Sequence, residues 1–178
     1  MIDTTGLQRS ARTLTLVLTG VQAFLVAGIF VLVAAAANTP MVLGHWLAGL
    51  AGANPEGMAT WQAMALALLV AGQLGLWLGA AGAMRQTFAA LGWLDPAGAS
   101  LAARRAARWL WSVLIVGVLA HMAATGIATW HYPEGERMLG ISLGSSQVST
   151  ALAALLAAFM ARAFSLGADL WRDNRGMI

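Results

Sequence analysis

The sequence contains no cysteine, no lysine and little charge of either sign, since only 10% of its 178 residues are charged. The absence of cysteine excludes disulfides, thiolate metal sites and thiol redox chemistry. Apolar residues make up 60% of the chain and the mean hydropathy is +0.74, which excludes an ordinary soluble domain. At this length, the chain has no room for a soluble enzymatic module beside its apolar segments.

Four long apolar segments dominate the sequence: 13–37, 60–82, 108–130 and 142–164. A helix needs roughly 20 apolar residues to cross about 30 Å of hydrocarbon, so each segment is a candidate span. We therefore predict an all-α fold, an integral membrane four-helix bundle that forms one domain over residues 1–178. The first apolar run is about 20 residues rather than the roughly 7–15 of a signal peptide's core, so we expect it to be a span.

The arginines predict the orientation in the membrane. All ten basic residues are arginines, and all except Arg137 flank one side of the predicted spans. These nine are Arg9, Arg12, Arg85, Arg104, Arg105, Arg108, Arg162, Arg172 and Arg175. Short arginine-rich segments stay in the cytoplasm, so both termini and the 83–107 connection should be cytoplasmic. Arginine without lysine, amid abundant alanine and glycine, is typical of a GC-rich bacterial genome, and we expect a multi-pass protein of the bacterial inner membrane.

The first outer connection, 38–59, carries its own helical pattern. Apolar residues recur at roughly helical spacing between Met41 and Leu50, bounded by Pro40 on one side and Asn54 on the other. This pattern indicates a short helix lying in the outer membrane interface. Such a helix would cover the outer end of the bundle or close over a ligand.

The cytoplasmic connection is also expected to be structured. The second helix should continue past the membrane and end near Gly92. Asp95-Pro96 is a helix start, because an Asp side chain accepts backbone N–H bonds and Pro fits the first helical position. One long helix should therefore cover 97–130, and the tail should stay helical to about Asp173.

Two stripes of small residues indicate packing faces: Gly72, Gly75, Gly79 and Gly82 on the second span, and Ala151, Ala154, Ala158 and Ala161 on the fourth. Both stripes lie on one face of a helix, and Gly75 and Gly79 form a GxxxG motif. Small residues let helix backbones approach closely, which drives helix association in lipid. The stripes pack the second span against the fourth, or each packs a neighbour, or one faces another subunit.

Three polar side chains lie deep in the spans: Gln22, Gln73 and His121. Each is about 9–13 residues from the cytoplasmic end of its span, or roughly 14–19 Å at 1.5 Å per residue. They are therefore predicted to share a hydrogen-bonded layer near the midplane, because polar groups buried in lipid need partners. No Asp or Glu lies inside a predicted span, which argues against proton or ion transport.

His121 is the one deep residue that could ligate a metal. His45 and His131 both lie on the outer side, which disfavours a haem with two histidine ligands. A single ligand suffices for a (bacterio)chlorophyll, and Gly117-x-x-x-His121 resembles the small-x-x-x-His arrangement of light-harvesting polypeptides, where the small residue makes room for the macrocycle. A structural histidine is the simpler interpretation, and pigment or haem binding at His121 stays open.

The sequence offers no catalytic constellation. It contains no GxSxG, P-loop or HExxH motif, and no Ser/His/Asp set that the predicted topology would bring together. We therefore predict no catalytic residue, no metal site and no enzymatic activity.

Two stretches resemble an uncharacterised family of bacterial four-helix membrane proteins, the domain-of-unknown-function 2975 family. The inner segment matches its plan through Arg85-Gln-Thr-Phe88, Gly92-Trp93, Asp95-Pro96 and Leu101 followed by Arg104-Arg105. The end of the fourth span is similar over 163–174, whereas the final Gly176-Met177-Ile178 departs from the family's usual finish. The resemblance implies a four-helix membrane fold and no known activity. Some relatives sit beside small helix-turn-helix regulators, which implies a regulatory partnership.

These observations favour a non-catalytic accessory or scaffolding subunit of a larger bacterial membrane complex, respiratory or photosynthetic. Its partners would be the lipid bilayer and other membrane subunits, and no direct contact with nucleic acid is expected, because topology and anionic lipid account for the high pI. The first alternative is a membrane-embedded regulator whose cytoplasmic basic face docks a small helix-turn-helix protein. That face would consist of Arg104, Arg105, Arg108, Arg172 and Arg175. The second alternative is the pigment or haem protein with its ligand at His121.

Overall fold

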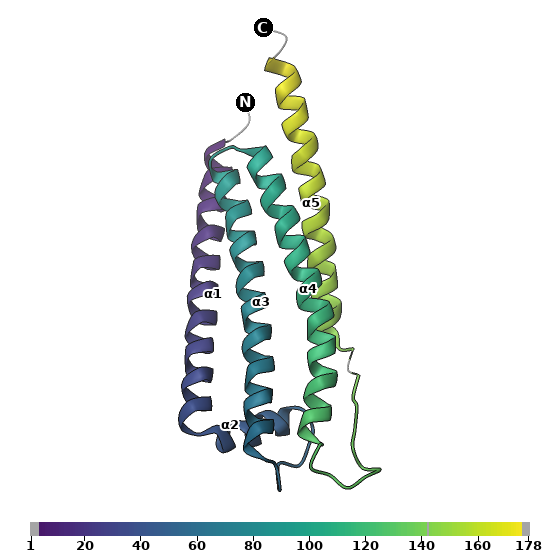
Figure 1. Ribbon diagram of the computed structural model, residues 1–178. Coiled ribbons are helices and arrows are strands. Elements are labelled where there is room, and N and C mark those ends of the chain that lie inside the picture. Colours follow the sequence, from purple (N-terminus) through teal and green to yellow (C-terminus); the bar gives the residue numbers. More distant parts are fainter. Residues whose placement is uncertain (1–3, 142, 176–178) are drawn as a thin grey trace.

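The computed structural model describes residues 4–141 and 143–175. Within these ranges the ordered elements are all helices, with no strand (Figure 1). They are α1 (Thr4–Asn38), α2 (Pro40–Leu50), α3 (Thr60–Gly92), α4 (Pro96–Ala128) and α5 (Ser145–Arg175). All except α2 are long and apolar enough to cross a membrane. The predicted all-α membrane fold is confirmed, and the chain is a multi-pass membrane protein.

The helix boundaries follow local capping chemistry. As predicted, α3 ends at Gly92 and α4 starts after Asp95, whose Oδ1 accepts a hydrogen bond from the Gly98 N–H at 2.9 Å. The helix predicted over 97–130 ends at Ala128, slightly before the expected end. α5 begins at Ser145, and Ser142, where the fourth span was predicted to begin, lies outside the described residues.

The four long helices stand in an open row in the order α1, α3, α4, α5 (Figure 1). Each packs on its neighbours in the row, and among the described residues no Cα of α1 comes within 8 Å of α4 or α5. The same holds between α3 and α5. The short outer connections make α1 and α3, and α4 and α5, antiparallel neighbours as expected. The predicted four-helix bundle is an open one, because the two end helices each have only one long neighbour.

The buried core is divided between two places along the row. One cluster lies at the outer end, where α2 lies across α3 and contacts α1 and α4. It contains Leu47, Ala48, Ala53, Met58, Ala63, Leu66, Ala67 and Ala128. The other lies where α3, α4 and α5 pack together and is mostly alanine: Ala80, Ala83, Ala106, Ala107, Leu110, Val113, Ala154 and Ala157. Small side chains let these helices approach closely without a large apolar core.

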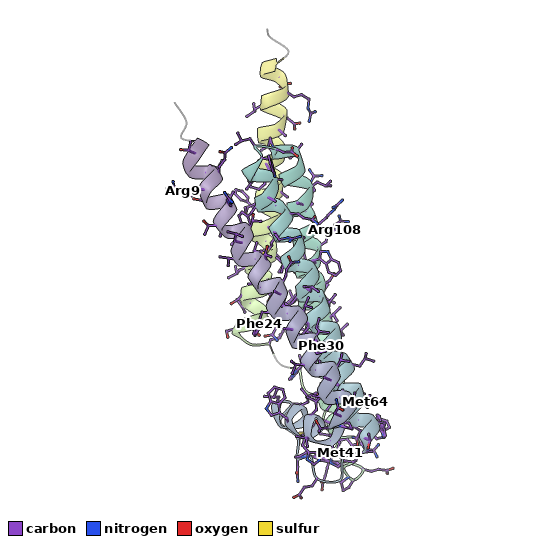
Figure 2. All side chains as sticks on the ribbon, turned by 90° about the vertical axis from the view of Figure 1, so that its left-hand side faces the viewer. Arg9, Phe24, Phe30, Met41, Met64 and Arg108 are labelled. Atoms are coloured by element: carbon purple, nitrogen blue, oxygen red, sulfur yellow. The ribbon has the colours of Figure 1, made fainter. Side chains whose placement is uncertain are left out.

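The outer faces of the row are strongly apolar. Along α1, Phe24 and Phe30 are 77% and 73% exposed and point away from the other helices (Figure 2). Both termini lie at the same end of the molecule, where α5 extends beyond the other helices (Figure 1). The exposed Phe24 and Phe30 side chains are suited to contact with lipid or with other membrane helices.

Candidate functional site

The alanine stripe of the fourth span packs inside the chain. Ala154 and Ala161 are buried, and Ala154 belongs to the core that α5 forms with α3 and α4. Ala151 is half-buried, whereas Ala158 is exposed. The interpretation that this stripe joins the second and fourth spans by direct backbone contact is wrong, because α3 and α5 share no close Cα pair. The stripe lies instead at the seam between α5 and α4.

The glycine stripe of α3 divides into a covered half and a bare half. A Cβ added to Gly79 would lie 2.8–2.9 Å from three atoms of the Trp109 ring, so glycine is needed for that ring to pack on α3. A Cβ added to Gly82 would lie 3.1 Å from Gln22 Nε2. Gly72 and Gly75 are exposed, and a Cβ at either position would meet nothing within 4 Å. Only the bare half is available to something outside the chain.

The bare glycines continue an exposed face of α3. Trp61, Met64 and Leu68 are exposed and precede Gly72 and Gly75 at spacings of three or four residues, which places them on one side of the helix. Along this side of α3 the exposed side chains are large and apolar up to Leu68, and the backbone is uncovered at Gly72 and Gly75. The notch at Gly72 and Gly75 lies between the exposed Leu68 and the Trp109 ring that covers Gly79.

Gln73 and His121 lie close together at the centre of the row, as predicted, but among the described residues no hydrogen bond joins them, so the predicted hydrogen-bonded layer is not formed. The Gln73 Nε2 donates a hydrogen bond to the Val113 carbonyl at 3.2 Å, and its Oε1 is buried with no partner among the described residues. Gln73, Gly117 and His121 line two cavities of about 220 and 230 Å³. The first cavity extends toward α2, and the second extends toward α5.

Gln22 does not belong to the same layer, which corrects the prediction. It lies level with Gly82, which is nine positions along α3 from Gln73, or about 14 Å at the rise of a helix. The prediction counted every span from a common depth. In the structure, however, α3 continues to Gly92, and a Cβ at Gly92 would lie 3.8 Å from the Ala11 Cβ. The first turns of α1 are therefore level with the part of α3 beyond the predicted span, and this displaces Gln22 toward that end of the row.

The space around His121 does not fit a macrocycle between the helices. A Cβ added to Gly117 would lie 3.0 Å from Gln73 Nε2, so the room left by this glycine is taken by the Gln73 side chain. Each cavity beside His121 is smaller than the roughly 300–1,000 Å³ of ordinary small-molecule sites. The arrangement favours the structural role of His121 over pigment or haem ligation.

A spectrum tests this interpretation. We expect purified protein to show the same visible absorption before and after His121→Ala, because Gly117 and Gln73 leave no slot for a planar macrocycle beside the ring. The measurement is the absorption spectrum from 350 to about 900 nm in mild detergent, the range in which porphyrin-type cofactors absorb. A haem or bacteriochlorophyll band in the native protein that disappears in His121→Ala would contradict it.

A polar network at the outer end was not anticipated from the sequence. Gln62 is 1% exposed; its Oε1 accepts from the Ala59 N–H at 2.7 Å and its Nε2 donates to the Ile127 carbonyl at 2.6 Å. It thereby joins the first turn of α3 to the last turn of α4. Its Nε2 also lies 3.5 Å from His131 Nδ1. The signal that could have identified Gln62 is its place three residues after Ala59, where Gln bonds back to an unpaired helix N–H.

Thr125 in the last turn of α4 and Thr129 directly after that helix hold the connection between α4 and α5. The Thr125 hydroxyl accepts from the Gly140 N–H at 2.9 Å, and the Thr129 hydroxyl accepts from the Met138 N–H at 3.1 Å. The two threonines are four residues apart and so lie on one side at the end of α4. The connection between α4 and α5 is therefore bonded to the helix that precedes it.

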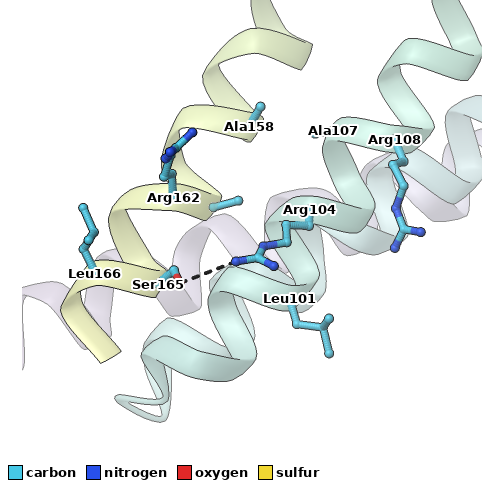
Figure 3. A pocket seen from close by; sticks show the side chains of 9 residues that line it. Leu101, Arg104, Ala107, Arg108, Ala158, Arg162, Ser165 and Leu166 are labelled. Carbon is cyan, nitrogen blue, oxygen red and sulfur yellow. Dashed lines mark hydrogen bonds between the residues drawn. The ribbon is translucent and has the colours of Figure 1, made fainter. Parts of the chain in front are cut away.

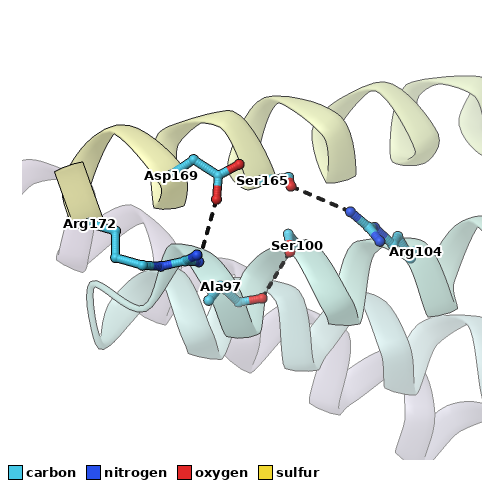
Figure 4. A network of polar contacts seen from close by, with 6 residues as sticks. All are labelled: Ala97, Ser100, Arg104, Ser165, Asp169 and Arg172. Atoms are coloured by element: carbon cyan, nitrogen blue, oxygen red, sulfur yellow. Dashed lines mark hydrogen bonds and ion pairs between the residues drawn. The ribbon is translucent and has the colours of Figure 1, made fainter.

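The described arginines of the predicted basic face lie in three places. Arg104 and Arg108 line a groove between α4 and α5, together with Arg162, which the prediction left out (Figure 3). Arg105 and Arg108 line a second hollow of about 320 Å³ on α4. Arg172 pairs instead with Asp169 at 3.4 Å (Figure 4). The side chain of Arg175 lies outside the described residues.

No family model, no curated protein and no solved structure matches this chain. The resemblance to the domain-of-unknown-function 2975 family stays a prediction. Among the described residues, no three His, Cys, Asp or Glu side chains come together in a group that could hold a metal ion. The features that can be argued further are therefore the open row, the bare glycines of α3 and the arginine-lined groove.

Proposed function

We propose that this chain is a non-catalytic accessory subunit that packs against helices of a larger membrane assembly. The observation that carries the proposal is the open row, in which the middle of α3 turns bare backbone outward at Gly72 and Gly75. Helix association in lipid depends on close packing at small residues, and a Cβ added to either glycine would meet no atom of another described helix within 4 Å.

The unfavourable effect of Gly72 and Gly75 on helix stability supports the proposal. Glycine inside a helix is less favourable than alanine by roughly 0.5–1 kcal/mol. At Gly79 that cost is offset by the contact with Trp109, which a Cβ would prevent. At Gly72 and Gly75 no contact with another described helix offsets it, and because the two glycines follow the exposed Leu68 on one side of α3, a helix from another subunit could pack into the notch.

The cellular setting is part of the proposal. The distribution of arginines supports a bacterial inner membrane with both termini in the cytoplasm. A respiratory or photosynthetic complex is the kind of assembly that holds small non-catalytic helical subunits. The regulator is the second candidate, because α5 extends beyond the other helices at the end where both termini lie (Figure 1).

Native purification tests the proposal. We expect the native chain to co-purify with stoichiometric membrane subunits in mild detergent, and the Gly72→Leu/Gly75→Leu double variant to lose them. The leucine side chains would fill the notch, separate α3 from the partner helix and remove the packing between them. A loss of about 1.4 kcal/mol of binding free energy weakens association tenfold. The measurement is mass spectrometry of the purified complex, with the amount of each partner per chain.

The matched control is Gly20→Leu, which places the same side chain at an exposed α1 glycine that also meets nothing within 4 Å. This control should keep the partners. Partners that survive the double variant would refute the notch as the interface. A soluble DNA-binding partner in place of membrane subunits would support the regulator, and a homogeneous monomer would exclude both functions.

A further inference from the structure

We propose that the groove between α4 and α5 binds the phosphodiester headgroup of an anionic phospholipid. The groove has a volume of about 800 Å³, and Arg104, Arg108 and Arg162 line it together with Ser165 (Figure 3). Three arginine side chains from two helices thus line one open space. Arginine is suited to this ligand because its planar group donates two parallel hydrogen bonds to phosphate oxygens.

These arginines have no carboxylate partner among the described residues. The ion pair in that part of the chain is between Arg172 and Asp169, at the far end of α5 (Figure 4). Asp169 lies one turn beyond Ser165 and is the acidic residue of α5 nearest to the groove in sequence. Its carboxylate is paired with Arg172 and not with an arginine of the groove. The positive charge of the groove is therefore not neutralised by the chain itself, and an anion from outside would be stabilised there.

Arg104 is already held in position across the groove. Its Nη2 donates a hydrogen bond to Ser165 Oγ at 3.4 Å, which links α4 to α5 (Figure 4). An arginine side chain has five N–H donors, so the others can bind a ligand. Because this hydrogen bond already restricts the Arg104 side chain, less side-chain entropy is lost when the ligand binds.

The level of the groove along the predicted spans and the small apolar residue in its lining favour a lipid over a soluble anion. Arg108 and Arg162 lie at the cytoplasmic ends of the predicted spans 108–130 and 142–164, the level of lipid headgroups. One turn deeper on α5, the exposed Ala158 continues the lining of the groove, and its small side chain leaves space for an acyl chain. A basic pocket between membrane helices with an apolar extension is typical of anionic lipid recognition.

Lipid titration tests the proposal on the full, delipidated chain in non-ionic detergent. Native mass spectrometry would follow binding of phosphatidylglycerol, phosphatidylcholine and inorganic phosphate. We expect phosphatidylglycerol to bind more tightly than phosphatidylcholine, and R108Q/R162Q to weaken phosphatidylglycerol binding by about fivefold per arginine, or roughly 25-fold in total. The charge-matched control R9Q/R12Q should change this affinity little, because both exposed arginines lie on α1, where no described Cα comes within 8 Å of α4 or α5, and exposed charges are screened beyond about 10 Å.

A second pair of variants keeps the charge unchanged. Ala158→Leu should weaken phosphatidylglycerol binding by filling the groove, whereas Ala163→Leu, at another exposed α5 position, should not. This pair decides the question if R108Q/R162Q fails to fold. Unchanged affinity in Ala158→Leu, an equal loss in R9Q/R12Q, or equal binding of the two lipids would overturn the proposal. Inorganic phosphate that binds as tightly as phosphatidylglycerol would overturn it as well.

Discussion

Replacing Gly44 with alanine is expected to lower the free energy of unfolding by about 1–3 kcal/mol, the usual cost of overpacking a close helix contact. Gly44 is buried in α2, where a Cβ would collide with the Ala63 Cβ and the Met58 Cε and would lie 3.0 Å from the Ala63 Cα. Two of these atoms belong to the main chain of α3 or lie next to it. They can therefore not move aside as the end of a flexible side chain could.

The consequence of Gly44→Ala should be partial undocking of α2. This helix buries Leu47 and Ala48 in the outer core, and both lie on the same side of α2 as Gly44. If the backbones of α2 and α3 separate, these residues lose contacts too. Unfolding in detergent, followed by circular dichroism as a denaturing detergent is added, would measure the loss of stability.

The matched control for this variant is Gly49→Ala in the same helix. Gly49 is exposed, and a Cβ there would meet nothing within 4 Å. Alanine is the better helix former by roughly 0.5–1 kcal/mol, so this control should be neutral or slightly stabilising. If both variants have the same small effect, α2 does not pack on α3 as closely as the structure requires.

The elements of the fold could be predicted because their causes are local. Apolar runs of span length, an Asp-Pro helix start and the helical pattern between Met41 and Leu50 each depend on residues close in sequence. These features correspond to α1, α2, α3, α4 and α5 with boundary differences of a few residues at most helix ends. The largest difference is at the start of α1, which begins at Thr4, before the predicted span.

The order of the helices could not be predicted from the same signals. Every span is apolar on most of its surface, because lipid covers whatever another helix does not, so hydrophobicity does not identify the packing faces. The glycine and alanine stripes indicate close approach without naming the partner. Gly79 accommodates Trp109, whereas Gly75 on the same stripe meets nothing within the chain.

The candidate site residues were only partly predicted, for the same reason. Gln73 and His121 were expected to lie together, and they line the same two cavities. Gln22 was misplaced because relative depth depends on the register between α1 and α3, which is a tertiary property. Arg162 joins Arg104 only because α5 packs beside α4, and that pairing is not visible in the spacing of either helix.

Replacing Gln62 with leucine is the other change with a large expected effect. The free energy of unfolding should fall by about 2–4 kcal/mol, since two part-buried hydrogen bonds of a buried side chain are lost and each unmatched polar group costs roughly 1–3 kcal/mol. The Ala59 N–H at the start of α3 would lose its side-chain partner. The Ile127 carbonyl near the end of α4 would keep only its longer bond from the Trp130 N–H, at 3.3 Å.

Gln73→Leu is the matched control for this prediction, because it is the same substitution in the same helix. Gln73 makes one hydrogen bond, to the Val113 carbonyl, and its buried Oε1 has no partner among the described residues. Leucine would remove that bond and also an unpaired buried acceptor, so the net change should be below about 1 kcal/mol. Detergent unfolding of the two variants side by side would measure the difference. Equal losses would mean that Gln62 does not hold the outer ends of α3 and α4 together.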